Sequence, residues 1–136
     1  MYLVDTNIFL EVLLSRKRKE SCKKFLRILG DGKKSGIITD FTIHSIIVIM
    51  DGFKKLAELK TFLSSLSAYK GLYIYYTNLA TEIRAVNLAL EKGLDMDDAI
   101  QYSAALSVGA ECIVSYDKHF DGLNIPRKTP EELIER

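Results

Sequence analysis

The sequence predicts an α/β fold, with a central, mostly parallel sheet of four to five strands and helices on both of its faces. Short apolar runs rich in β-branched and aromatic residues recur along the chain, and longer segments with helical spacing of apolar residues separate them. Strands that alternate with helices in this way form parallel sheets covered on both sides. Hydrophobic residues make up 48% of the 136 residues, so we expect a packed core in a single domain over residues 1–136.

The first thirty residues predict a strand followed by two helices. Residues 1–5 form an apolar run that ends in an acid, and Thr6 or Asn7 can cap the helix that follows. Residues 15–20 are mostly charged and predict an exposed connection. Apolar side chains then recur at helical spacing until Gly30, which ends the second helix.

A long apolar run lies in residues 41–50, directly after a short strand at residues 37–39. We place this run in a buried helix rather than in a strand, because Thr39 or Asp40 can cap it. The Asp-Gly pair at residues 51–52 is a turn signal that ends the helix.

Two further helices flank a third strand. Residues 53–66 form an amphipathic helix, and residues 71–76, rich in aromatic side chains that favour β-structure, form the strand. Thr77 or Asn78 then opens a helix that Gly93 closes. One apolar face of this helix is made by Leu79, Ile83, Val86 and Leu90.

The last third of the chain places acids near the ends of its elements. Asp95 and Asp98 open a helix of small residues that Gly109 ends. A short apolar strand at residues 112–114 is suited to burial on both faces, and Asp117 lies just beyond it. The chain is completed by an edge strand over residues 124–127 and a helix that starts within residues 129–132.

Several classes of protein are disfavoured by composition. No apolar run approaches the roughly 18–20 residues that a membrane span needs, and the N-terminus begins with a strand rather than a signal peptide. Cys22 and Cys112 lack the spacing of metal ligands, so we expect buried free thiols in a reducing cytoplasm. Neither histidine lies in a motif for a ligand or a general base. We expect His44 in the core or an interface, and His119 on the surface.

Charge is unevenly distributed, although the net charge is only +1. Residues 1–45 carry nine Lys or Arg against five Asp or Glu, whereas residues 46–136 carry ten against thirteen. A basic first third and an acidic remainder suit a protein that holds a polyanion beside an acid-lined metal site. Ordinary surface charge produces the same counts, so charge alone does not decide the function.

Three acids are candidates for one site. Asp5, Asp98 and Asp117 lie next to predicted strand or helix ends, and α/β proteins bind ligands beyond the carboxyl ends of their parallel strands. Two carboxylates about 4 Å apart repel by roughly 4 kcal/mol at an effective dielectric constant of about 20, so three together would hold protons or a cation. Oxygen ligands favour Mg²⁺ or Mn²⁺, either of which can activate water for phosphodiester hydrolysis. Considered singly, each acid can instead be a helix cap or a strand end.

Residues at these positions resemble those of the PIN domain, and especially of the VapC-type toxin ribonucleases. The matching pieces are Val4-Asp-Thr-Asn7, Asp98-Ala99 at a helix start, and Ser115-Tyr-Asp117 followed by Phe120. The resemblance extends over essentially the whole chain, in its size and its order of elements. It implies a three-layer α/β/α sandwich with Mg²⁺- or Mn²⁺-dependent endoribonuclease activity, and we expect single-stranded RNA to be the substrate.

The resemblance also implies roles for individual residues and partners. Asp5, Asp98 and Asp117 would be the catalytic metal ligands, whereas Asn7 and Ser115 would orient Asp5 and the loop that holds Asp117. Frequent homodimers are implied as well. For toxin members of the family, the resemblance further implies an inhibitory antitoxin protein as partner.

One position departs from the family pattern. The family usually has a glutamate early in the helix after the second strand, and here that position is Ser45, or His44 if the alignment shifts by one. Losing a carboxylate should weaken metal binding, so the chain would need more metal, recruit Asp40 or Asp95, or be a poor nuclease.

Two other functions compete with the nuclease. The missing acid favours a non-catalytic or weakly active PIN-like module that binds RNA or protein. A phospho-accepting signalling or phosphatase module also uses aspartates at strand ends. Against that alternative, the run after Asp5 lacks the second acid, two residues on, that such phosphatases use.

Overall fold

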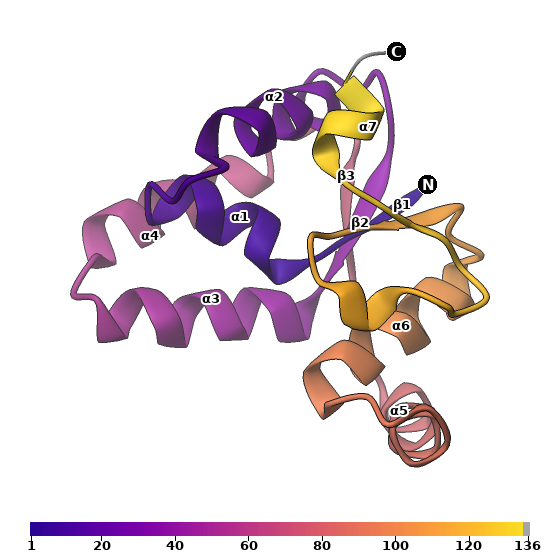
Figure 1. Ribbon diagram of the computed structural model, residues 1–136. Coiled ribbons are helices and arrows are strands. Elements are labelled where there is room, and N and C mark those ends of the chain that lie inside the picture. Colours follow the sequence, from indigo (N-terminus) through magenta and orange to yellow (C-terminus); the bar gives the residue numbers. More distant parts are fainter. Residues whose placement is uncertain (135–136) are drawn as a thin grey trace.

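A computed structural model describes residues 1–134, and its five-stranded sheet lies between two layers of helices (Figure 1). The final two residues of the expected domain, 135–136, lie outside the described residues. The strands are β1 (Tyr2–Val4), β2 (Gly36–Thr39), β3 (Leu72–Tyr75), β4 (Cys112–Val114) and β5 (Arg127–Lys128). The helices are α1 (Thr6–Leu13), α2 (Lys19–Gly30), α3 (Asp40–Gly52), α4 (Leu56–Leu66), α5 (Leu79–Lys92), α6 (Met96–Val108) and α7 (Pro130–Ile134), with a 3-10 turn η1 (Lys118–Phe120). The predicted α/β/α sandwich is confirmed.

The strand order places β1 at the centre of the sheet. All neighbouring strands are parallel in the order β3-β2-β1-β4-β5, so the chain builds the sheet outward from β1 in both directions. Val4 at the end of β1 is in register with Val114 at the end of β4. The direction in which strands are added therefore reverses between β1 and β4. In open parallel sheets, ligands bind beyond the carboxyl ends of the strands at such a point. The residues that follow Val4 and Val114 therefore occupy the favoured ligand position of this fold.

The core lies on both faces of the sheet because side chains alternate along each strand. Tyr2 and Val4 pack with the helices α1, α2, α3 and α4, whereas Leu3 packs on the other face with α6. Helix α5 packs against α6, where Ala85 and Ala99 belong to one small buried cluster. These small residues let α5 and α6 approach closely, and α5 forms the outer edge of the molecule (Figure 1).

Several predicted helix ends are confirmed. Gly93 and Gly109 end α5 and α6 in the left-handed conformation, with φ of 70° and 63°. Thr39 and Asn78 cap α3 and α5, because each side chain accepts a backbone N–H from the first turn. Cys22 and Cys112 are buried free thiols, as expected. Within residues 1–134, no helix combines the length and the apolar character that a membrane crossing needs.

The predicted starts and ends of some elements are wrong. Neither Thr6 nor Asn7 caps α1; Asp5 takes the cap position without a side-chain capping bond, because its carboxylate is used elsewhere. Helix α3 continues through Gly52, and the chain reverses at Lys54, whose φ is 57°. The last strand was predicted over residues 124–127, whereas β5 begins after Pro126 and contains only Arg127–Lys128.

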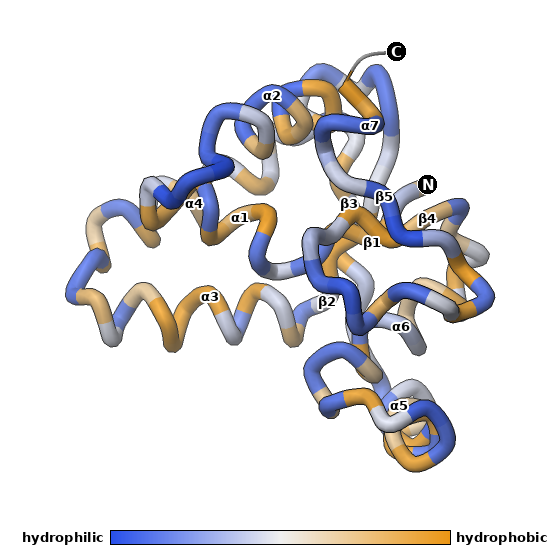
Figure 2. Tube along the Cα trace, in the orientation of Figure 1, coloured by the Kyte–Doolittle hydropathy of each residue, from blue (hydrophilic) through white to orange (hydrophobic). Residues whose placement is uncertain are grey.

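Two helix faces that the sequence assigned to apolar contacts are exposed. On α3, His44 is exposed rather than in the core, and Val48 is 70% exposed. The stripe on α5 is also exposed, with Leu79 at 71% and Leu90 at 80%. Apolar segments lie along α5 on the side away from the sheet (Figure 2). Periodicity predicted the α5 stripe correctly, but it does not tell whether the rest of the chain covers it. The prediction of a buried helix over residues 41–50 is wrong for the face that carries His44 and Val48.

Candidate metal centre

Asp5 lies directly beyond β1 and is only 3% exposed. Ser115 Oγ donates to Asp5 Oδ2 at 2.7 Å, and Gln101 Nε2 donates to Asp5 Oδ1 at 3.1 Å. Burial raises the pKa of Asp5 above its ordinary value. The two hydrogen bonds oppose that rise by stabilising the carboxylate, whereas nearby Asp97 and Asp117 add to it.

Ser115 connects two of the candidate acids. Besides donating to Asp5, its hydroxyl oxygen accepts the backbone N–H of Asp117 at 2.9 Å. One buried side chain thus joins the end of β1 to the loop that carries Asp117. Asn7 is placed differently: it is exposed on α1, and Gln101 supplies the other side-chain hydrogen bond to Asp5.

Asp98 and Asp117 approach each other from α6 and from the loop after β4. One ligand atom each of Asp98, Asp117 and His119 lies within 4.8 Å of the others. Asp98 is 8% exposed, and burial, with the charges of Asp117, Asp5 and then Asp97, raises its pKa to about 7. The charge of His119 opposes this rise.

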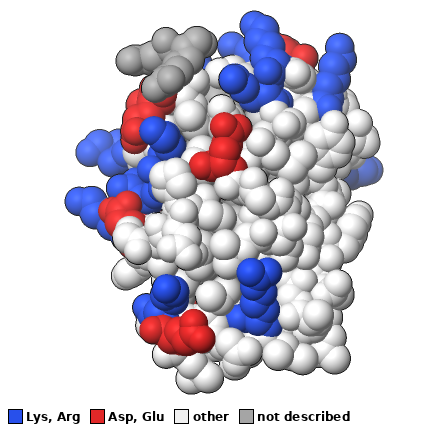
Figure 3. All heavy atoms as spheres, turned by 90° about the vertical axis from the view of Figure 1, so that its right-hand side faces the viewer, with Lys and Arg blue, Asp and Glu red and all other residues white. Residues whose placement is uncertain are grey.

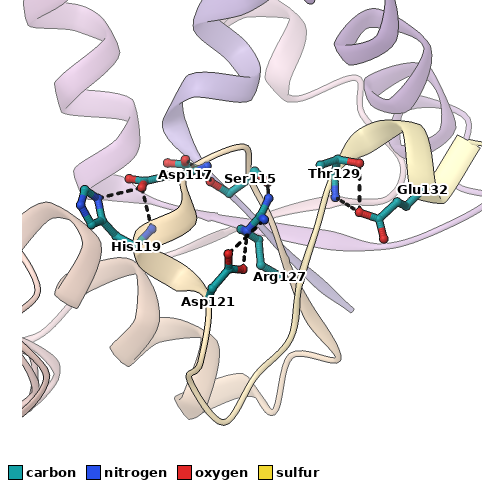
Figure 4. A network of polar contacts seen from close by, with 8 residues as sticks. Ser115, Asp117, His119, Asp121, Arg127, Thr129 and Glu132 are labelled. Carbon is teal, nitrogen blue, oxygen red and sulfur yellow. Dashed lines mark hydrogen bonds and ion pairs between the residues drawn. The ribbon is translucent and has the colours of Figure 1, made fainter.

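His119 is a site residue that the sequence did not reveal. Its Nδ1 lies 2.8 Å from Asp117 Oδ1, and its backbone N–H donates to the same oxygen at 2.9 Å. Figure 4 shows the two side chains turned toward each other. The side chain is 77% exposed, so the predicted surface position is right, but it lies at the rim of the acidic cluster. Its spacing of two residues from Asp117 was the available signal.

Asp97 and Gln101 were also missed. Gln101 Nε2 donates to Asp97 Oδ1 at 3.1 Å as well as to Asp5. Gln101 is fully buried at 0% exposure, and its Oε1 is a buried oxygen without a hydrogen-bond partner among the described residues. The signal in the sequence was a glutamine within a run of small and apolar residues, one turn after an acid.

The C-terminal segment holds the loop that carries Asp117. Arg127 Nη1 donates to the backbone oxygen of Ser115 at 3.1 Å while its Nε contacts Asp121 Oδ1 at 2.7 Å (Figure 4). Tyr116 OH donates to Glu131 Oε1 at 2.8 Å. The loop is therefore fixed from β5 and α7 as well as from Ser115.

The acids proposed as replacements for the missing glutamate lie elsewhere. Asp40 Oδ1 accepts the N–H and the hydroxyl of Thr77 at 3.0 and 2.9 Å, which ties α3 to the segment after β3. Asp95 is exposed at the N-cap of α6. Ser45 is half-buried on α3 and supplies no carboxylate.

The donor set fits a hard divalent cation. Its ligand atoms are carboxylate oxygens with one imidazole nitrogen, and burial, with the charges of Asp117 and Asp5, raises the pKa of Asp98, a rise that a bound cation would reverse. Gln101 Oε1, which lacks a partner among the described residues, is free to accept a hydrogen bond from cation-bound water. A parallel sandwich with clustered carboxylates beyond its central strands defines an α/β protein whose site suits a divalent cation and phosphate oxygens.

Comparison with known families gives the identity of this class. The family model described as PIN domain matches residues 2–125, and the chain belongs to that family. Members of this family are generally nucleases that use divalent metals. No curated protein matches the sequence at a significant level.

Three solved structures similar to this chain are a toxin and two toxin–antitoxin complexes. A toxin–antitoxin complex from Klebsiella pneumoniae is 25% identical, with a TM-score of 0.70 over 96% of this chain and 98% of that one. Mycobacterium tuberculosis VapC20, a sarcin–ricin loop cleaving toxin, is 11% identical, with a TM-score of 0.74 over 92% and 96%. VapBC2 from Rickettsia felis, bound to a DNA fragment from its promoter, is 18% identical, with a TM-score of 0.69 over 94% and 97%. The last two similarities concern the fold alone.

Proposed function

We propose that the protein is a Mg²⁺- or Mn²⁺-dependent endoribonuclease that hydrolyses phosphodiester bonds of single-stranded RNA. The observation that best supports this function is the approach of Asp98 to Asp117 beyond the adjacent ends of β1 and β4, with Asp5 close enough for its charge to act on Asp98. Burial, and then the charges of Asp117, Asp5 and Asp97, raise the pKa of Asp98 to about 7, and a bound cation would oppose this rise.

The roles of the site residues follow from their contacts. Asp98 and Asp117 would hold the cation, with Asp5 fixed beside them by Ser115 and Gln101. A bound divalent ion lowers the pKa of a water and neutralises charge on the phosphoryl oxygens. His119 orients the carboxylate of Asp117 and, when protonated, offsets part of its negative charge.

Basic side chains of the first third of the chain support an RNA substrate. Lys23, Lys24 and Arg27 are exposed on α2. Arg18 lies over Tyr116, with its guanidinium carbon 4.0 Å from the ring centre, and Tyr116 immediately precedes Asp117. On the face seen in Figure 3, Lys and Arg gather at the upper end and along the left edge, and a smaller group of both charges lies at the lower end. The exposed basic residues of α2 lead us to expect that a polyanion follows that helix.

We also propose two protein partners, a second copy of the chain and an antitoxin. The exposed stripe on α5 supports the homodimer, because its residues recur at alternating spacings of four, three and four, the pattern of a helix–helix seam. The residues of this stripe are Leu79, Ile83, Val86 and Leu90. The similar complexes from toxin–antitoxin systems support an antitoxin partner.

A second candidate is a non-catalytic PIN module that binds RNA or protein. Ser45 favours it, because a site with one acid fewer should bind a cation more weakly. One experiment separates the two candidates: purified protein is incubated with varied RNAs and Mn²⁺, beside the Asp98→Asn variant. Cleavage that the variant lacks supports the nuclease. If the unaltered chain cleaves none of the RNAs, or if Asp98→Asn cleaves them equally well, the binding module is the remaining candidate.

A further inference from the structure

A fourth carboxylate lies beside the three candidate ligands, although the position where the family usually has a glutamate is Ser45. We infer that Asp97 supplies the fourth carboxylate of the cation site and that Gln101 is the residue that positions it. This inference rests on the proposed function, because it concerns the same cation. It names two residues of α6 that the resemblance to the family does not assign.

The bond geometry of Gln101 carries the first step. Its single amide nitrogen donates to Asp5 Oδ1 and to Asp97 Oδ1, each at 3.1 Å, so both of its hydrogens are used. The opposite orientation of the amide would set Oε1 against two carboxylate oxygens, which repel it. The Gln101 amide therefore links Asp97 to Asp5, the most buried acid of the site.

The partnerless oxygen carries the second step. Gln101 Oε1 is buried without a hydrogen-bond partner among residues 1–134, and such acceptors are rare in folded proteins. It belongs to the amide whose nitrogen contacts Asp5 and Asp97. A water in the shell of a bound cation is a donor that would satisfy it.

Position along α6 explains why Asp97 can serve the site. Asp97 and Gln101 are four residues apart, so their side chains lie on the same side of the helix, and Asp98 follows in the same first turn. The electrostatic effects agree with this placement, because the charge of Asp97 raises the pKa of both Asp5 and Asp98. Asp40 is engaged by Thr77 instead.

The test is titration calorimetry of the metal-free chain with Mn²⁺ alone. Asp97→Asn should weaken Mn²⁺ binding by about tenfold or more, since even the loss of a residue that only orients metal ligands typically weakens binding by that much. Asp95 and Asp97 are both exposed, so Asp95→Asn, which removes an equal charge two residues away, is the matched control. It should change the affinity by less than about threefold, because the contact with Gln101 is made by Asp97, whereas Asp95 sits at the N-cap of α6 without a side-chain capping bond.

The Asp98→Asn variant distinguishes a failure of this inference from a failure of the proposed nuclease function. If Asp98→Asn abolishes binding while Asp97→Asn behaves like Asp95→Asn, the fourth carboxylate is refuted and the proposed function stands. If the unaltered chain binds no Mn²⁺ at millimolar concentration, both are refuted. Gln101→Met keeps the buried volume and should also weaken Mn²⁺ binding. In the Gln101→Met variant, adding Asp97→Asn should lower the Mn²⁺ affinity clearly less than Asp97→Asn does in the unaltered chain. An equal loss of affinity in both would refute the positioning role of Gln101.

Discussion

Ser115 Oγ lies 2.7 Å from Asp5 Oδ2, although 110 positions of the chain separate the two residues. The contact exists because β1 and β4 are neighbours in the sheet and end in register. It links Asp5 to the loop that carries Asp117. Three predictions concern this contact and those around it, and a fourth concerns the exposed stripe on α5.

Replacing Ser115 with alanine should destabilise the protein and weaken Mn²⁺ binding. The change removes a donor from a buried carboxylate and an acceptor from the N–H of Asp117, so we expect a loss of about 1–3 kcal/mol in the free energy of unfolding near neutral pH. Urea denaturation measures it. Ser107→Ala, at an exposed position on α6, is the control. Equal stability of the two variants would contradict the role of Ser115.

Stability of the metal-free protein should fall as the pH rises through the acidic range. The unfolded chain releases the Asp98 proton near 3.8, whereas the folded protein keeps it until about 7. Between these values the folded state binds more protons, so raising the pH favours unfolding. Denaturation curves at several pH values, with a chelator present, should show this slope. Asp98→Asn should have a flatter profile, and an unchanged slope would show that Asp98 is not the group responsible.

Removing the Tyr116 hydroxyl should loosen the loop that carries Asp117. Tyr116→Phe deletes a hydrogen bond to the Glu131 carboxylate, so we expect about 1.5–3 kcal/mol less stability. Glu131→Gln is the partner variant for a double-mutant cycle measured by chemical denaturation. The two effects should be less than additive, because both changes break one contact. Strict additivity would mean that the contact does not contribute.

A charge in the α5 stripe should prevent dimer formation. Ile83 and Val86 are 56% and 45% exposed at the middle of the stripe, so Ile83→Glu or Val86→Glu would bury a charge in the proposed interface. Light scattering after gel filtration should then report a monomer in place of a dimer. Val48→Glu, at a 70% exposed position of α3, should leave the dimer intact. If the unaltered chain is monomeric at high concentration, the proposed homodimer is wrong.

The sequence alone was sufficient for those features that depend on neighbouring residues. Helix spacing, the glycines at 93 and 109, and the caps at Thr39 and Asn78 are local, because each capping bond joins residues within one turn. The capping pair of Thr129 and Glu132 belongs to the same group. The acids at strand ends were also predictable, since parallel strands place their carboxyl ends on one edge.

Tertiary structure decided which of these local features serve the site. Asp5 occupies a helix cap position, yet its carboxylate binds Ser115 and Gln101, because the fold brings these two side-chain donors to the end of β1. The apolar stripe of α5 is exposed because that helix packs on α6 through its opposite face. Such outcomes depend on strand order and on contacts between residues far apart in the chain. Periodicity and capping rules involve only a few neighbouring residues, so they cannot predict the partners of Asp5 or the exposure of the α5 stripe.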